Sequence, residues 1–208
     1  MNILICDDHK IVREGLMQIL QQLEGETYFE EAGNGHEALT FLKNKVFDIV
    51  LLDISLPDMS GLEILQSVKG KWPSTNVLIL SMHPQEQYAL RAIKLGASGY
   101  LTKDTASEEL LLAVKKVSEG GKYISQSLAE SIAFNMDRDS QKQKHEKLSS
   151  REFEIMIKLA KGKSLQEIGN ELFISNKTVS TYRSRILEKM EFNKNAELTI
   201  FCIENKLI

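Results

Sequence analysis

The stretch "FDIVLLDISLPDMSG", residues Phe47 to Gly61, is the most informative part of the sequence about the fold. It begins with a short apolar run that ends in an aspartate, and a turn containing Pro, Ser and Gly follows. A short run that is apolar on both faces is typical of a buried strand in a parallel sheet. Three more runs of this kind occur in the first half of the chain: Ile3 to Cys6, Val77 to Met82 and Gly99 to Leu101.

Segments with helical periodicity separate these runs. The clearest example is the set Leu110, Val114 and Val117. A weaker strand at Tyr28 to Ala32 brings the number of expected strands to five. The alternation of strands and helices therefore predicts an α/β domain, with a five-stranded, doubly wound parallel sheet between helices. Because Gly120 and Gly121 end the last helix, this domain is expected to span residues 1–121.

The remainder of the chain shows helical patterns and no strand signals. Residues 122–146 are predicted to form a linker, with one short helix at Ser125 to Met136 and a polar stretch from Asp137 to Lys147. Residues 147–208 are predicted to form a small all-α domain of four helices. Their expected ranges are Ser150 to Lys161, Ser164 to Phe173, Asn176 to Met190 and Asn195 to Asn205.

The composition is that of a soluble globular protein, with 208 residues, 42% hydrophobic and 26% charged. No apolar run approaches membrane-spanning length, so we expect a cytoplasmic protein without a membrane partner. Cys6 and Cys202 lie in separate apolar stretches, which favours buried free thiols. Residues 1–146 hold 15 basic and 21 acidic residues, a net charge of −6, and residues 147–208 hold 11 and 8, a net charge of +3.

Four charged residues follow the predicted strands, namely Asp7, Asp8, Asp53 and Lys103. The carboxyl ends of parallel strands share one edge of a sheet, so these side chains should meet in one crevice. Clustered carboxylates need a compensating cation, and Mg²⁺ prefers oxygen ligands. If Asp7 and Asp8 hold the ion, Asp53 is left to attack an electrophilic phosphorus, while Lys103 neutralises charge on the transferred group.

The stretch "SLQEIGNELFISNKTVSTYRSRILEKM" has the order of a helix-turn-helix, in which a short helix, a turn and a longer helix follow one another. Val179, Ile186 and Met190 share one face of the longer helix and should face the core. On the other side, Ser180, Thr181 and Ser184 suit hydrogen bonds to base edges. The basic residues that are expected to reach phosphate or guanine are Lys177, Arg183 and Arg185.

The first half of the chain resembles the response-regulator receiver family through the motifs "DDH", "LLDISLPDMSG", "LSMH" and "GASGYLTKD". The resemblance implies a flavodoxin-like strand order, 2-1-3-4-5. It also implies that a sensor histidine kinase phosphorylates Asp53, and that the backbone carbonyl of Ser55 joins Asp7, Asp8 and Asp53 around Mg²⁺. Ser81 and Tyr100 are then the switch residues.

The second half resembles the LuxR-type helix-turn-helix of the NarL/FixJ regulators through "LSSREFEIM" and "IGNELFISNKTVSTYRSRILEKM". The resemblance implies that Ser180, Thr181 and Ser184 contact bases, that Lys177 contacts phosphate, and that the active form is a homodimer on double-stranded DNA. Gly169 departs from the family, which commonly has alanine there. In the interior of a helix, glycine costs about 1 kcal/mol.

Together these features predict a DNA-binding transcriptional regulator that Mg²⁺-dependent phosphorylation of Asp53 controls. Such a protein is not an enzyme beyond catalysing its own phosphorylation and dephosphorylation. Two alternatives remain at this point. One is a DNA-binding regulator that works without phosphorylation. The other is an aspartyl-phosphate hydrolase, although Ser55 stands where such an enzyme has a second aspartate.

Overall fold

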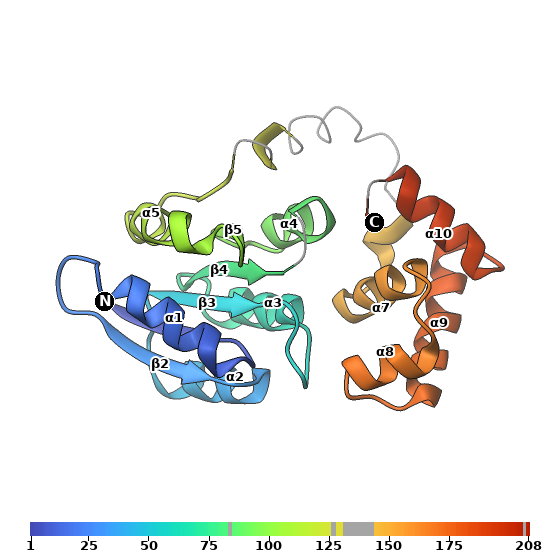
Figure 1. The fold of residues 1–208 in the computed structure, drawn as a ribbon, viewed down its shortest axis with the longest axis horizontal. Helices are drawn as coiled ribbons and strands as arrows, with labels where there is room; N and C mark the ends of the chain where they lie inside the picture. The colour runs from blue at the N-terminus through green and yellow to red at the C-terminus, as the bar shows by residue number, and fades with distance from the viewer. Residues whose placement is uncertain (83–84, 126–127, 131–143, 206) are drawn as a thin grey trace. The chain divides into compact units, whose positions relative to one another are not determined.

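The computed structural model describes residues 1–82, 85–125, 128–130, 144–205 and 207–208. The chain divides into two compact units, Met1–Ile132 and Ala133–Ile208, which we describe separately (Figure 1). The short helix predicted at 125–136 and the polar stretch at 137–147 lie largely outside the described residues. The described parts of these two segments include helical residues at 128–130 and a 3-10 helix, η1, at Lys144–Lys147.

The described residues of the N-terminal unit include a sheet of five parallel strands in the order β2-β1-β3-β4-β5. The strands are β1 (Asn2–Cys6), β2 (Tyr28–Ala32), β3 (Ile49–Asp53), β4 (Asn76–Ser81) and β5 (Gly99–Thr102). This confirms the predicted parallel sheet, the weak strand at Tyr28–Ala32 and the flavodoxin-like order. Strand β3 begins two residues later than predicted, at Ile49, which is level with Ile3 of β1 and with Asn76, the first residue of β4.

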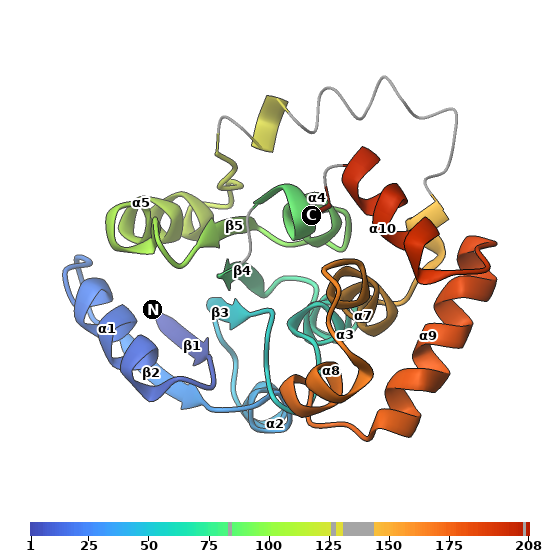
Figure 2. The same cartoon turned by 45° about the vertical axis from the view of Figure 1, so that its right-hand side comes forward.

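Helices cover both faces of this sheet, as Figure 2 shows. They are α1 (Lys10–Leu20), α2 (Gly35–Asn44), α3 (Gly61–Lys71), α4 (Gln85–Lys94) and α5 (Ala106–Ser118). Helices α1 and α5 share one core with alternate side chains of the strands, including Ile3 and Ile5 of β1. Helices α2, α3 and α4 lie on the opposite face (Figure 2). All five residues of β3 are buried, as expected for a central strand covered on both sides.

The strand register places the carboxyl ends of β1, β3 and β4 side by side. Cys6 of β1 is level with Leu52 of β3, and Asp53 is level with Leu80 of β4. The residues that follow β1 therefore lie beside Asp53, as the sequence predicted.

The C-terminal unit contains the four predicted helices. They are α7 (Ser150–Ala160), α8 (Leu165–Glu171), α9 (Asn176–Met190) and α10 (Asn195–Glu204). Capping boxes begin α7 at Ser149 and α8 at Ser164. The predicted core stripe of α9 is confirmed, because its three residues are fully buried: Val179, Ile186 and Met190.

Both cysteines are buried and unpaired, as their apolar surroundings predicted. Among the described residues, no helix is long and apolar enough to cross a membrane.

Candidate functional sites

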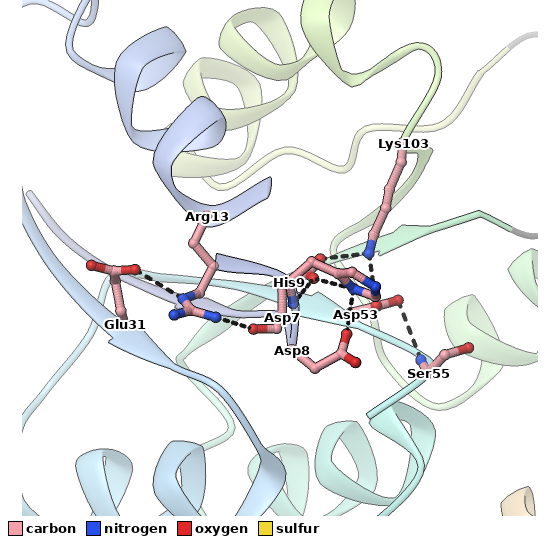
Figure 3. Close-up of polar contacts among 8 residues, drawn as sticks. All are labelled: Asp7, Asp8, His9, Arg13, Glu31, Asp53, Ser55 and Lys103. Carbon is pink, nitrogen blue, oxygen red and sulfur yellow. Dashed lines mark hydrogen bonds and ion pairs between the residues drawn. The ribbon is translucent and has the colours of Figure 1, made fainter. Parts of the chain in front are cut away.

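The four charged residues predicted to converge do lie at one edge of the sheet, and three of them are in direct contact (Figure 3). Lys103 Nζ lies 2.7 Å from Asp53 Oδ2 and 2.5 Å from Asp7 Oδ2. The side chains of Asp7 and Asp53 are only 1% and 4% exposed, and that of Lys103 is 10% exposed. One ammonium group thus compensates two buried carboxylates.

Asp8 lies at the rim of this cluster, with its side chain 33% exposed. The His9 ring, which sequence reasoning did not assign to the site, lies against it: His9 Nδ1 is 2.6 Å from Asp8 Oδ1 and 3.4 Å from Asp7 Oδ1. The backbone N–H of His9 also donates to Asp7 Oδ1 at 2.9 Å. Arg13 of α1 contacts the backbone at the end of β1: it donates to the Asp7 carbonyl at 2.7 Å and pairs with Glu31 of β2 at 2.8 Å.

Burial dominates the electrostatics of the phosphoacceptor candidate. Burial, assisted by the charge of Asp7, raises the pKa of Asp53, although Lys103 works in the opposite direction. For Lys103, burial alone would lower the pKa, but the nearby carboxylates of Asp53 and Asp7 outweigh it and raise the pKa. Lys103 therefore stays cationic at neutral pH and favours the ionised, nucleophilic form of Asp53.

The donor set also fits a divalent cation. Asp7 Oδ2 is buried, and the cation beside it, Lys103 Nζ at 2.5 Å, is shared with Asp53. Asp7, Asp8 and His9 each offer one donor atom, and these atoms all lie within 4.8 Å of one another. Carboxylate oxygens of this kind are the ligands that Mg²⁺ prefers, so Asp7 and Asp8 are suited to hold it.

The backbone of the turn after β3 also borders the site. The N–H of Ser55 donates to Asp53 Oδ1 at 3.2 Å, and Ser55 forms an isolated antiparallel bridge with Ser60. The turn closes tightly, because the N–H of Gly61 donates to the carbonyl of Ile54 at 2.8 Å. The backbone of Ser55, which was predicted to supply a carbonyl ligand, thus lies next to the phosphoacceptor candidate.

The two predicted switch residues are both fully buried and lie on adjacent strands. Ser81 ends β4, one residue after Leu80, which is level with Asp53. Tyr100 lies on β5 and is level with Ile79 of β4. Their positions place the hydroxyl of Ser81 at the same sheet edge as Asp53, with Tyr100 further from that edge.

Helix α9 presents the predicted nucleic-acid contacts on the side away from its core stripe. Lys177, Thr181, Ser184 and Arg185 are exposed, and Ser180 is half-buried. The hydroxyls of Thr181 and Ser184 donate to backbone carbonyls one turn earlier, at 3.0 and 3.2 Å, and keep their acceptor lone pairs. The half-buried Arg183 differs, because its Nε donates to Asn195 Oδ1 at the start of α10, at 2.7 Å.

Charged side chains of α7 contact both α8 and α9. Arg151 of α7 pairs with Glu154 at 2.8 Å and donates to the carbonyl of Leu172, which ends α8, at 2.9 Å. Glu152 of α7 accepts the N–H of Ser149 at 2.7 Å and pairs with Lys189 of α9 at 2.7 Å. These contacts join α7 to both helices of the helix-turn-helix.

Glu152 gives this unit an acid-sensitive contribution to stability. Burial alone would raise its pKa, but the hydrogen bonds from Lys189 and Ser149 outweigh burial and lower it below the ordinary 4.5. A group with a depressed folded pKa stabilises the fold above its unfolded pKa, and this contribution is lost as the pH falls through the folded pKa. We expect Glu152→Gln to lower the free energy of unfolding by about 1 kcal/mol at pH 7. Because the variant lacks this titrating group, its stability should fall less steeply below about pH 5 than that of the unmodified protein.

Urea unfolding at pH 7 and at pH 4, followed by far-UV circular dichroism, measures this effect. The matched control is Glu204→Gln on the exposed end of α10, which should leave both values unchanged. Equal pH dependence in Glu152→Gln and in the unmodified protein would contradict the assignment.

Comparisons with known proteins bear on both units. Residues 3–115 match the family described as "Response regulator receiver domain", and residues 146–202 match "Bacterial regulatory proteins, luxR family". The response regulator UvrY of Escherichia coli K12 is 31% identical over 207 residues, covering 99% of this chain and 95% of that protein. The oxygen regulatory protein NreC of Staphylococcus epidermidis is 33% identical over 216 residues, covering 100% and 99%.

A solved structure supports the same fold. It is that of RcsB from Salmonella enterica serovar Typhimurium, bound to a promoter in the presence of the phosphomimetic BeF3−. It has a TM-score of 0.61 at 23% identity and covers 97% of each chain.

Proposed function

Because this chain belongs to the two-component response regulators that carry a receiver domain and a LuxR-type DNA-binding domain, we propose that phosphorylation of Asp53 controls its binding to DNA. In this proposal a sensor histidine kinase supplies the phosphoryl group, with Mg²⁺ held by Asp7, Asp8, Asp53 and the carbonyl of Ser55. Residues 1–121 form the receiver, 122–146 the linker and 147–208 the DNA-binding domain.

The observation that carries this proposal is the position of Lys103 between two buried carboxylates, at 2.7 and 2.5 Å. An oxygen of Asp53 attacks the phosphorus of a phosphohistidine, so a P–O bond forms as the P–N bond breaks, and the histidine leaves with a proton. A bound Mg²⁺ would supply positive charge for the oxygens of the transferred group. Lys103 is then free to leave one carboxylate and pair with the new phosphoryl oxygens.

The phosphoryl group is expected to act on the DNA-binding domain by a population shift rather than by new chemistry. Ser81 lies at the same sheet edge as Asp53, and its hydroxyl would hydrogen-bond to a phosphoryl oxygen. Tyr100, buried on the adjacent strand, would change its packing in response. In this proposal the receiver catalyses only its own phosphorylation and dephosphorylation. The form that regulates transcription is a homodimer bound to double-stranded DNA. RcsB, which has the same fold, is bound to a promoter in the presence of a phosphomimetic.

DNA affinity with and without phosphorylation tests this function. A duplex is first selected from a random pool by the full chain, and its affinity is then measured by fluorescence anisotropy before and after treatment with acetyl phosphate and Mg²⁺. We expect a gain in affinity within the range of about 5- to 150-fold for the natural chain and none for Asp53→Asn. An equal gain in both proteins, or none in either while DNA still binds, would favour a regulator that works without phosphorylation.

Two variants of α9 separate base contacts from phosphate contacts. Thr181→Ala should relax sequence preference at one position by about 1–3 kcal/mol. Lys177→Ala should weaken binding to all sequences alike and reduce the slope of affinity against salt concentration by about one. Anisotropy titrations on selected and random duplexes at several salt concentrations distinguish the two. Equal losses on both duplexes for both variants would contradict the assignment.

A further inference from the structure

His9 is a second kind of donor at the cation site. Its side chain is 65% exposed and reaches over the carboxylate cluster, where Figure 3 shows it between Asp8 and Asp7. His9 is also the residue that precedes α1, yet its side chain makes no capping hydrogen bond. Helix capping therefore does not account for the position of the ring, which is held by contacts to the two carboxylates.

The spacing of the donor atoms fits one shared ion. Two neighbouring ligands of an octahedral ion, each about 2.1 Å from it, lie about 3 Å apart. The distances from His9 Nδ1 to the carboxylate oxygens of Asp8 and Asp7, 2.6 and 3.4 Å, lie on either side of that value. An ion bound by Asp8 would thus have the imidazole nitrogen within reach after a shift of a few tenths of an ångström.

Asp7, which borders the same site, is deeply buried. The cation that lies 2.5 Å from its Oδ2 atom is Lys103. Such an atom is costly to bury unless a cation compensates it, and Lys103 is already shared with Asp53.

We propose that His9 is a nitrogen ligand of the metal ion in this site, so that the site binds first-row transition-metal ions more tightly than Mg²⁺. This inference rests on the proposed function, because it concerns the ion that assists phosphorylation of Asp53. Carboxylate and carbonyl oxygens suit Mg²⁺ and Mn²⁺, whereas imidazole adds affinity for the later ions of the series, such as Co²⁺ and Zn²⁺. A site that offers only oxygen ligands would gain much less affinity when Co²⁺ or Zn²⁺ replaces Mg²⁺.

The chain offers a matched control. His36 Nδ1 lies 2.5 Å from Asp58 Oδ2, and the His36 side chain is 78% exposed. Asp58 also accepts the backbone N–H groups of Gly35 and His36 at the start of α2. This pair repeats the histidine–carboxylate contact of His9 and Asp8 at a helix terminus, and it does not belong to the group of three close donors.

The test is titration of the full chain with Co²⁺ and, separately, with Mg²⁺, by calorimetry. Visible absorption of the Co²⁺ complex gives a second readout, because the spectrum depends on whether nitrogen is bound. We expect His9→Ala to lose about tenfold or more in Co²⁺ affinity and to shift the spectrum. Its Mg²⁺ affinity should change much less, and His36→Ala should match the unmodified protein with both ions.

The outcomes separate this inference from the function on which it rests. If Mg²⁺ binds and His9→Ala leaves Co²⁺ affinity unchanged, the inference is overturned and the proposed function stands. An affinity loss with an unchanged Co²⁺ spectrum also overturns it, because His9 then only orients Asp8. If neither ion binds the unmodified chain, both the inference and the cation-dependent function fail.

Discussion

Replacing Arg151 by methionine is expected to destabilise the C-terminal unit by about 3 kcal/mol or more. Arg151 is only 7% exposed, and the carboxylate of Glu154 beside it is 2% exposed. The change removes the cation that pairs with this buried carboxylate and also removes a donor to the carbonyl of Leu172. Breaking one side of a buried ion pair costs far more than the pair contributes, because the remaining charge stays out of water.

The double variant Arg151→Met, Glu154→Leu should recover part of this loss, since it removes the buried carboxylate together with its cation. Lys158→Met is the matched control: it breaks an ion pair of similar length, 2.8 Å, that joins α7 to α8, but its partner Glu171 is 37% exposed. We expect it to cost at most about 1 kcal/mol.

Urea unfolding can assign these effects to the correct unit. Trp72, the single tryptophan of the chain, follows α3 in the receiver, whereas far-UV circular dichroism reports on both units. The Arg151 variant should shift a dichroism transition and leave the tryptophan transition in place. Equal losses in Arg151→Met and Lys158→Met would show that burial does not decide the strength of these pairs.

Gly61→Ala is expected to destabilise the receiver by about 3 kcal/mol and to abolish phosphorylation of Asp53. A Cβ at Gly61 would lie 2.0 Å from the carbonyl oxygen of Asp53 and 2.8 Å from the Cα of Ile54. Both obstacles are backbone atoms, so the end of β3 must move, and the carboxylate of Asp53 moves with it.

Gly15→Ala in α1 is the control, because a Cβ there meets nothing within 4 Å. It should raise stability by up to about 1 kcal/mol through helix propensity. Tryptophan fluorescence during unfolding and intact mass after treatment with acetyl phosphate measure the two effects. A Gly61→Ala protein that is as stable and as readily phosphorylated as the natural chain would contradict the close packing after β3.

The sequence predicted the sheet and the convergence of charges well, because both follow from the period of apolar residues and from where parallel strands end. It did not predict that the His9 ring contacts the carboxylates of Asp7 and Asp8, since such a contact is recognised only from the distances between side chains. It expected Arg183 to reach phosphate or guanine, and the structure adds a contact from Arg183 Nε to Asn195 that no sequence pattern indicated. That contact joins residues whose proximity depends on the turn before α10.

Two other details depend on how the C-terminal unit packs, and no sequence pattern indicated them. Residues 137–147 appeared to be a polar linker, yet the ring of His145 packs 5.7 Å from the rings of both Phe153 and Phe201. Gly169 appeared to be a weak point of α8. In the structure, a Cβ there would lie 2.7 Å from the carbonyl oxygen of Ile174, so the tight turn into α9 gives the glycine a steric reason.

Intact mass after incubation with acetyl phosphate shows whether Asp53 is the phosphoacceptor. The natural chain and Asp53→Asn are treated with acetyl phosphate and Mg²⁺, each with and without EDTA, and circular dichroism verifies that both are folded. We expect one added phosphoryl group on the natural chain, none on Asp53→Asn, and none on either protein with EDTA. A folded natural chain that gains no phosphoryl group, or an Asp53→Asn protein that gains as much, would contradict this expectation.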